Sequence, residues 1–384
     1  MNPSGIPLAG GLFALPVDDG LVLYSQRKNR VFILNHSGKL VWNEISAGAA
    51  PAMAAQELAE AYGIPISAAV ADVAATLDQW KAEGLIEFGE EAAQVEPPIA
   101  AAPAGKKFPT HSEYTYRMLG RCFRVRYSDP CVEFQAHPRL VGAIAARDTA
   151  ECELGLVDDD GVYRLFIDGT EASANLLPEK TLGSFFGYLV EFLHPGLPLL
   201  VKVHGAAVGR QGRAVLMPAL CGAGKSTLTA ALTQRGYTYF SDDIAPITAG
   251  PVAMVAPVPI DIHLKQGSWA PLAPFISTLA SQPEIMHGGA HMGKYITPAE
   301  PARAIAPWPV GWIVFPFYKP GARTRLVPLS PIETLAHIAA SRSVVPAGIE
   351  NLKLILDFIR RTPSYLFELD SLDEAVAELE TLWS

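Results

Sequence analysis

The sequence has few cysteines, no long apolar run and no excess of positive charge. Its cysteines include no C-x-x-C pair, so neither a zinc knuckle nor a disulfide framework is indicated. No stretch of about 18 uninterrupted apolar residues occurs, which excludes a membrane-spanning helix. The formal net charge of −9 argues against broad attraction to nucleic acid or to an anionic membrane. We therefore expect a soluble cytoplasmic protein with neither kind of partner.

The composition is that of a globular protein of several domains. Hydrophobic residues make up 49% and charged residues 18% of the 384-residue chain, which excludes a disordered or coiled-coil protein. An Ala- and Pro-rich stretch, residues 90–107, shows neither helical nor strand periodicity and is predicted to be a linker. It would separate residues 1–89 from a flanking α+β region, 108–200, and a larger α/β domain, 201–384.

Residues 1–89 are predicted to form a small winged-helix-like α+β domain. Two β-prone runs flank a polar stretch and suit a hairpin, and three amphipathic helices and a short strand follow. Gly84 is a natural end for the third helix. The expected elements are Leu21–Tyr24, Val31–Leu34, a helix from Gly38, Ala54–Tyr62, Val70–Glu83 and Leu85–Phe88. The apolar stretch before them, Ile6 to Val17, is interrupted by Pro and Gly and is not a convincing signal peptide.

The segments LNHSGKLVWNEIS, AAQELAEAYG and VAATLDQWKAEGLIEF resemble PqqD-like peptide-binding domains of peptide-modifying pathways, over residues 12–88. In that family the domain captures the leader of a precursor peptide, which adds as a strand to the exposed hairpin edge. The resemblance implies a ribosomally made precursor peptide as the partner of residues 1–89. A winged-helix module that contacts the rest of the chain or another protein is the alternative. DNA binding is disfavoured, because Val70–Lys81 carries one Lys and two Asp.

The flanking region, residues 108–200, alternates strand-like runs such as Tyr163–Gly169 with turns, and a helix is expected near Leu182–Leu193. No motif in it indicates a chemistry. The acids Asp158–Asp160 stand before Gly161 and are predicted to be turn residues rather than metal ligands.

The most informative segment, Ala214–Asp243, is predicted to run strand, loop, helix and strand. Its loop resembles the G-x-x-x-x-G-K-[ST] pattern, although Ala219 stands at the first glycine position. In such loops backbone N–H groups and a helix N-terminus bind phosphates, the Lys neutralises charge, and the Ser or Thr hydroxyl holds Mg²⁺. A fortuitous small-residue loop is the alternative. The expected nucleotide-binding residues are Cys221, Gly222, Ala223, Gly224, Lys225, Ser226 and Thr227.

Two acids, Asp242 and Asp243, follow the next predicted strand, Tyr237–Phe240, at the end where ligands bind in open α/β sheets. One carboxylate can accept the proton of a substrate hydroxyl and the other can orient Mg²⁺, whereas a solvated loop is the alternative. Alternation over Pro259–Lys265 adds Asp261 as a candidate Mg²⁺ ligand and Lys265 as a candidate phosphate contact, unless this is a solvent-facing edge strand.

The segments VHGAAV, CGAGKST and RGYTYFSDD resemble the HPr kinase/phosphorylase family in order and spacing. They are more similar to the HPr-kinase-related proteins found beside peptide-modification genes, loosely over residues 108–345. The resemblance implies an α/β P-loop kinase that uses ATP and Mg²⁺, and it is compatible with a homo-oligomer. By position it makes Asp242 the general base, Lys225 the residue that steadies the phosphoryl group and His204 the active-site histidine. The expected metal ligands are Ser226, Asp243 and Asp261.

Two departures from that family, Thr227 in place of an acid and Leu220 in place of a polar residue, leave the reverse phosphorylase reaction undecided. The Gly- and His-rich stretch Ser281–Ala302 is a candidate lid, bearing Lys294 or followed by Arg303. A metal pair of His287 and His291 is disfavoured by the glycines between them. Scaffold elements are expected over GWIVFPFY, ETLAHIAAS, Leu352–Ile359 and Leu372–Leu382.

These patterns together predict an ATP-dependent kinase that phosphorylates a Ser or Thr of a precursor peptide captured by the N-terminal domain. The fold would be an α/β P-loop kinase domain with an N-terminal winged-helix-like peptide-binding domain. Two alternatives stay open. One is a nucleotide-dependent adaptor that delivers the peptide without phosphotransfer, and the other is a small-molecule kinase.

Overall fold

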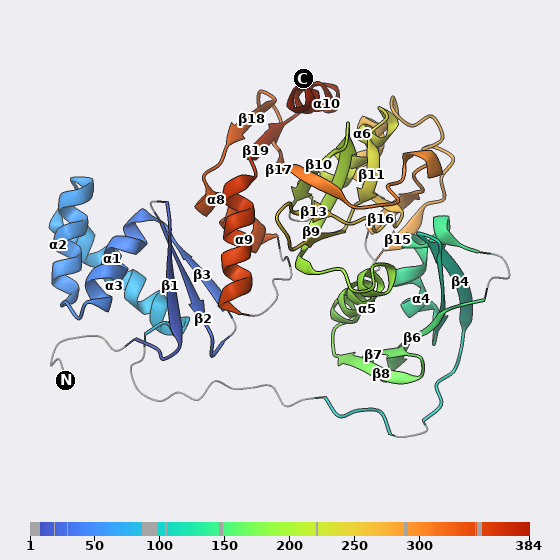
Figure 1. Ribbon diagram of the computed structural model, residues 1–384, viewed down its shortest axis with the longest axis horizontal. Helices are drawn as coiled ribbons and strands as arrows, with labels where there is room; N and C mark the ends of the chain where they lie inside the picture. Colours follow the sequence, from blue (N-terminus) through green and yellow to red (C-terminus); the bar gives the residue numbers. More distant parts are fainter. Residues whose placement is uncertain are drawn as a thin grey trace. The chain divides into compact units, whose positions relative to one another are not determined.

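The computed structural model divides the chain into two compact units, which are described separately (Figure 1). It describes residues 8–18, 20–28, 30–86, 99–103, 106–145, 149–219, 222–287, 291–341, 343 and 348–384. Unit 1 comprises Met1–Glu96, Ser330–Ala336 and Pro346–Arg360, and unit 2 comprises Pro97–Leu329, His337–Val345 and Arg361–Ser384. These boundaries differ from the expected ones, because two segments of residues 201–384 have their contacts in unit 1.

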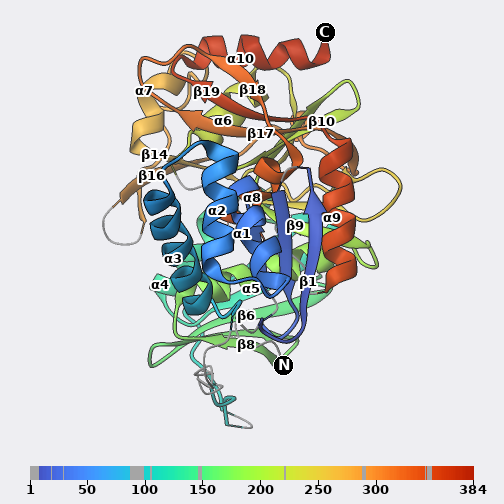
Figure 2. The same cartoon turned by 90° about the vertical axis from the view of Figure 1, so that its left-hand side faces the viewer.

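Unit 1 is a small α+β unit built on a three-stranded antiparallel sheet in the order β1-β2-β3. Three helices follow the sheet in the chain and pack side by side (Figure 2). Two later helices add to them, α8 through its residues Pro331–Ala336 and α9 up to Arg360. The bounds are β1 Leu12–Val17, β2 Gly20–Ser25, β3 Arg30–Leu34, α1 His36–Ser46, α2 Pro51–Tyr62, α3 Ile66–Ala82, α8 Pro331–Ala340 and α9 Ile349–Arg361.

The expected hairpin and the three helices of unit 1 are confirmed. Asn35 caps α1 by accepting a hydrogen bond from the Gly38 N–H at 2.9 Å, and Gly84 follows α3 with φ of 65°. Apolar residues of the sheet and helices share one core, in which Trp42 and Trp80 meet edge to face. Strand β1 was missed by the sequence analysis. The expected strand at Leu85–Phe88 is reduced to one bridge, Leu8 to Ile86, and residues 87 and 88 lie outside the described residues.

The late segments are integral parts of unit 1. A Cβ placed on Gly20 would come within 2.8 Å of Ile332 Cγ1 on α8, so this helix approaches the sheet where only glycine fits without a shift. The Gly348 N–H donates to Tyr24 Oη at 3.0 Å, and Arg360 Nη2 donates to the Pro16 carbonyl at 3.2 Å. Helices α8 and α9 were expected to be scaffold of the large domain. The first part of α8, up to Ala336, and α9 up to Arg360 belong to unit 1 instead, whereas α8 from His337 onward belongs to unit 2.

Unit 2 contains a five-stranded sheet in the order β4-β5-β6-β7-β8, which corresponds to the expected flanking region. Helices α4 and α5 share its core. Asp158 and Asp159 end β6, and Asp160 lies in the turn to β7 with φ of 53°, where Asp158 Oδ1 accepts from the Gly161 N–H at 2.8 Å. The bounds are β4 Ser112–Met118, β5 Arg121–Tyr127, α4 Pro130–Ala136, η1 His137–Arg139, η2 Val141–Ala143, β6 Cys152–Asp159, β7 Val162–Ile167, β8 Thr170–Asn175 and α5 Pro178–Leu193.

The rest of unit 2 is a mixed α/β structure on an eight-stranded sheet. Its path is β10-β9-β12-β13-β17-β19-β18, with β11 paired to β9 and a further parallel pairing of β10 with β17. A separate three-stranded sheet has the order β14-β16-β15. The bounds are β9 Leu199–Arg210, β10 Arg213–Pro218, α6 Lys225–Gln234, β11 Thr238–Ser241, β12 Ile244–Thr248, β13 Met254–Val255, β14 Ile262–Lys265, η3 Gln266–Ser268, α7 Trp269–Leu272, β15 Ile285–His287, β16 His291–Ile296, η4 Glu300–Ala302, β17 Trp308–Tyr318, β18 Arg325–Pro328, β19 Ser364–Leu369, α10 Leu372–Glu380 and η5 Thr381–Trp383.

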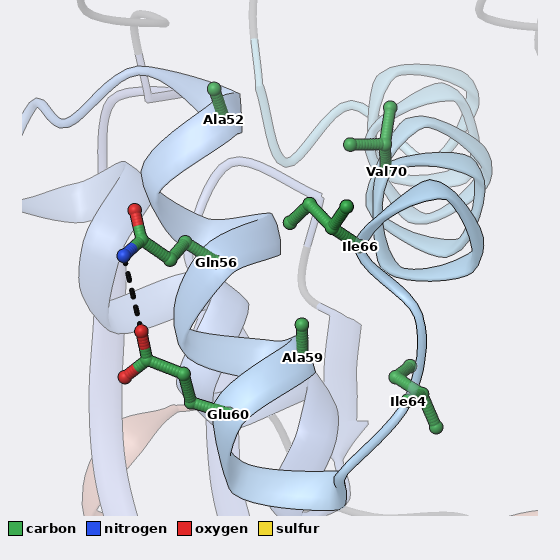
Figure 3. A pocket seen from close by; sticks show the side chains of 7 residues that line it. All are labelled: Ala52, Gln56, Ala59, Glu60, Ile64, Ile66 and Val70. Carbon is green, nitrogen blue, oxygen red and sulfur yellow. Dashed lines mark hydrogen bonds between the residues drawn. The ribbon is translucent and has the colours of Figure 1, made fainter.

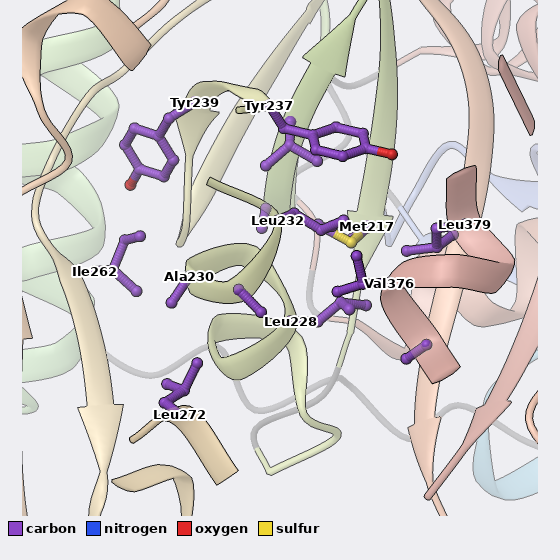
Figure 4. Close-up of a cluster of buried hydrophobic side chains, with 14 of the residues drawn as sticks. Met217, Leu228, Ala230, Leu232, Tyr237, Tyr239, Ile262, Leu272, Val376 and Leu379 are labelled. Atoms are coloured by element: carbon purple, nitrogen blue, oxygen red, sulfur yellow. The ribbon is translucent and has the colours of Figure 1, made fainter. Parts of the chain in front are cut away.

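Helix α6 is held in place by the buried core of this part of unit 2 (Figure 4). Leu228 and Leu232 of the helix are buried together with Met217 of β10 and Val376 of α10. Full burial of a Leu side chain stabilises by roughly 1.5–3 kcal/mol, so these contacts fix the start of α6 against the end of β10. The expected order of strand, loop, helix and strand is present. Within the described residues, no helix is long and apolar enough to cross a membrane.

Candidate active site

The loop between β10 and α6 adopts the conformation that its glycines permit. Gly222 and Gly224 both have φ of 92°, a region that favours glycine, and Gly224 immediately precedes the first residue of α6. Ala219 is not among the residues with positive φ, so alanine is tolerated at the first glycine position. Leu220 and Cys221 lie outside the described residues. The loop therefore leads directly into a helix N-terminus, where unpaired N–H groups favour an anion.

Three of the predicted residues meet at this N-terminus. Lys225 Nζ donates to the backbone carbonyl of Asp242 and lies 3.3 Å from Asp242 Oδ1. Ser226 Oγ donates to Asp242 Oδ2 at 2.9 Å. The side chains of Lys225 and Asp242 are only 9% and 4% exposed, so each charge compensates the other in a site with little water.

The second acid, Asp243, belongs to a different group of side chains. Its carboxylate forms an ion pair with Arg139, and Oδ1 lies 3.7 Å from His204 Nδ1. The histidine ring lies 3.1 Å from the Asp243 carbonyl, and its backbone N–H donates to Ser343 Oγ at 3.2 Å. Strand β9 carries His204 opposite Ile244 of β12, which brings the histidine beside the acids. His204 therefore lies beside Asp243.

Arg139 and Ser343 were missed by the sequence analysis. Arg139 ends η1 in a region with no motif, and its guanidinium reaches Asp243 only because the chain folds back over more than a hundred residues. Its Nε atom is buried and has no hydrogen-bond partner among the described residues, and the guanidinium lies 5.6 Å from the ring centre of Phe186. No local sequence signal could have identified it.

The predicted metal ligands are only partly brought together. Ser226 contacts Asp242, and no described contact joins it to Asp243 or Asp261. Asp261 precedes β14 and is buried, and its Oδ2 accepts from the Gly142 N–H at 2.8 Å. Burial raises the pKa of Asp261 above the usual 3.8. Asp261 therefore anchors η2 through Gly142. No described contact joins Asp261 or Lys265 to the residues at the start of α6.

The lid residues also have structural partners. Lys294 is buried, and its Nζ donates to the carbonyls of Leu279 at 3.1 Å and Ala280 at 3.2 Å. Arg303 Nε donates to the Pro298 carbonyl at 2.7 Å. In the ranges that the structure describes, no three His, Cys, Asp or Glu side chains are grouped as a metal site. The candidate site therefore consists of two adjacent groups, Lys225–Ser226–Asp242 and Asp243–His204–Arg139.

Unit 1 carries a groove of about 870 Å³ along β3 and α3. Strand β3 is an edge strand that pairs only with β2 in the described part of the chain, so its outer backbone groups are available to another strand. A smaller hollow of about 520 Å³ lies between α2 and α3, with Ala59 and Val70 on its two sides (Figure 3). Only the larger one borders a free sheet edge.

Comparison with known proteins assigns part of unit 1. Residues 20–86 match the family described as "Coenzyme PQQ synthesis protein D (PqqD)". This region is therefore a PqqD domain, a recognition element for ribosomally synthesised and post-translationally modified peptides (RiPPs), and the predicted resemblance is confirmed. No curated protein matches the chain.

Two solved structures are among the structural neighbours. "TbiB1 in Complex with the TbiA(beta) Leader Peptide" is 17% identical, with a TM-score of 0.21, over 22% of this chain and 100% of that chain. "Structure of the Hpr(Ser) kinase/phosphatase from Coxiella burnetii" is 13% identical, with a TM-score of 0.26, over 47% of this chain and 87% of that chain.

Proposed function

We propose that this protein is an ATP-dependent kinase that phosphorylates a Ser or Thr hydroxyl of a ribosomally made precursor peptide held by unit 1. The observation that carries the proposal is the meeting of Lys225, Ser226 and Asp242 at the N-terminus of α6, directly after two glycines with positive φ. This set combines phosphate-binding N–H groups, a buried ammonium and two oxygen donors. A PqqD domain in the same chain favours a peptide substrate.

The side chains fit MgATP by their chemistry. Ser226 Oγ and Asp242 Oδ2 lie 2.9 Å apart and are the hard oxygen ligands that Mg²⁺ prefers. When bound, Mg²⁺ would neutralise the charge that develops on the β- and γ-phosphates. Lys225 would exchange the Asp242 oxygens for phosphate oxygens, and the α6 N–H groups would orient the triphosphate. Phosphoryl transfer would then depend mainly on positioning and charge neutralisation.

The exposure of the two acids supports a division of roles that differs from the expected one. A general base must come within hydrogen-bond reach of the acceptor hydroxyl. The Asp242 side chain is 4% exposed and is occupied by Lys225 and Ser226, whereas the Asp243 side chain is 31% exposed. We therefore assign Asp242 to the metal and Asp243, beside His204, to the acceptor proton. Arg139 would orient the Asp243 carboxylate.

Tethering of the peptide is part of the proposal, because unit 1 and the candidate site belong to one chain. A leader held at β3 would raise the local concentration of the acceptor residue to the mM range, as for a short flexible linkage. Weak contacts at the catalytic site would then be sufficient. This arrangement favours a peptide kinase over a small-molecule kinase, for which the groove would have no use.

The kinase and the adaptor hypotheses differ in their response to Asp243→Asn. A kinase should keep MgATP binding and lose transfer of the γ-phosphoryl group to the peptide by about 10²–10⁴-fold, the usual contribution of a general base. An adaptor should keep both nucleotide binding and delivery of the peptide. Lys225→Ala is the control that should lose nucleotide binding itself. Transfer by Asp243→Asn at the wild-type rate would contradict the assignment of the base.

A further inference from the structure

The groove of unit 1 has an apolar floor. Its lining comes from the end of β3, from α1, α2 and α3, and from α8. Leu34, Val41, Leu58 and Trp80 are buried and lie beneath the opening, while Tyr62 is exposed at it. A floor of this kind accommodates the apolar side chains on one face of an extended peptide, since alternate residues of a strand point the same way.

Helix α8 supplies one wall of the groove, from a part of the chain far from the PqqD domain in sequence. Its residues Ile332, Glu333 and Ala336 line the groove, and Ile332 is fixed by its close approach to Gly20. Glu333 Oε2 accepts from both the N–H and the hydroxyl of Ser330 at 2.8 Å. This capping arrangement holds the Glu333 carboxylate in the first turn of α8, at the groove.

The charged residues that line the groove are all acidic. They are Asp72 on α3 and Glu333 on α8, and among the described residues no Lys, Arg or His is part of the lining. Both acids are exposed, so they can meet a partner without prior burial of charge. An occupant with acidic side chains would be repelled, whereas Lys or Arg beside the apolar anchors would be attracted.

We infer that the groove selects an extended peptide segment in which apolar residues are accompanied by Lys or Arg, with α8 acting as a specificity wall added to the PqqD domain. The inference rests on the proposed function for the kind of partner, a peptide that adds to the edge of β3. It goes further in naming the chemistry of that peptide. It also makes recognition depend on Asp72 and on Glu333, a residue outside the family match.

The test is selection from a displayed library of random peptides of about 12 residues, long enough for two strands of ordinary length. The full chain is used without nucleotide. Wild-type protein should enrich peptides that combine Lys or Arg with aliphatic or aromatic residues. Exposed ion pairs contribute about 0.2–1 kcal/mol, so Asp72→Asn and Glu333→Gln should each weaken an enriched peptide by about 1.5–5-fold and together by up to about 25-fold.

Matched controls separate selectivity from folding. Gln can replace Glu in the capping arrangement, so Glu333→Gln should leave the thermal midpoint unchanged. Asp78→Asn removes an exposed carboxylate from α3 that does not line the groove, and it should not alter binding. Enrichment without basic residues, affinity unaffected by the double variant, or no enrichment at all would each overturn the inference. Since no nucleotide is present, these failures leave MgATP binding and transfer to be tested separately.

Discussion

Replacement of Asp242 by Asn should separate two effects of its carboxylate. The side chain compensates the positive charge of the buried Lys225 ammonium and accepts a hydrogen bond from the Ser226 hydroxyl. It is almost completely shielded from water. Asn preserves the shape and keeps one oxygen, but it removes the charge. The Asp242 backbone carbonyl remains as a partner of Lys225.

The magnitude follows from these contacts. Breaking a buried ion pair costs about 3–5 kcal/mol, and hydrogen bonds to charged groups contribute about 1.5–3 kcal/mol. Because Lys225 keeps its bond to the backbone, we expect the free energy of unfolding to fall by about 2–3 kcal/mol. Binding of metal-free ATP should strengthen by roughly tenfold, since the variant no longer repels the triphosphate and Lys225 is easier to recruit. Addition of Mg²⁺ should then raise the affinity for ATP by a factor that is roughly ten times smaller in the variant than in the wild type.

Isothermal titration of ATP with and without Mg²⁺, together with urea unfolding, measures all three quantities. Asp243→Asn is the matched control, because that carboxylate contacts Arg139 and His204 rather than the loop. The control should retain the wild-type dependence on Mg²⁺. Equal dependence on Mg²⁺ in the wild type and in Asp242→Asn would refute the assignment of Asp242 to the metal.

Other expected outcomes concern positions around the two sites. Arg139→Gln should lower kcat by about tenfold or more while changing the affinity for MgATP less than threefold, as steady-state kinetics would show, because it orients Asp243 rather than the loop. Gly20→Ala should lower the stability of unit 1 by about 1–3 kcal/mol in urea unfolding, because the new Cβ would lie 2.8 Å from both Ile332 Cγ1 and the Leu34 carbonyl oxygen. The pKa of Asp261 is raised in the folded state, so as pH rises the unfolded state loses this proton at a lower pH than the folded state does. The stability of the wild type relative to Asp261→Asn should therefore fall as pH rises above about 3.8, and level off above the raised pKa, in unfolding measured over a pH series. A fragment of residues 108–384 lacks the partners of α8 and α9, so limited proteolysis should cut it in these helices before it cuts the full chain.

Local patterns were sufficient to predict much of the fold. The helix that follows Gly224 and the strands beside it were identified because glycine spacing, apolar periodicity and acid placement all occur within a short segment. The hairpin and helices of the PqqD domain were identified for the same reason. Lys225, Ser226 and Asp242 were therefore expected in one site, and the structure brings them together.

Features that depend on distant contacts could not be predicted. Strand β1 contains Pro16 and follows two glycines, so its sequence pattern does not predict a strand. Only its pairing with β2 identifies it as one. Arg139 reaches Asp243 through tertiary structure alone. The contacts of α8 in unit 1 depend on a close approach to Gly20, which no periodicity reveals. The family resemblance assigned Asp242 to the base and Asp243 to the metal, whereas the hydrogen bond of Ser226 favours Asp242 as its partner.

Mass spectrometry of a precursor peptide encoded beside this protein's gene, after incubation with the protein and MgATP, tests peptide phosphorylation itself. The wild-type protein should add the mass of one phosphoryl group to a Ser or Thr of the peptide. Lys225→Ala should give no modified peptide, and a peptide without its leader should be modified much more slowly. An unmodified peptide in the presence of protein that binds both MgATP and the leader would contradict the proposed kinase.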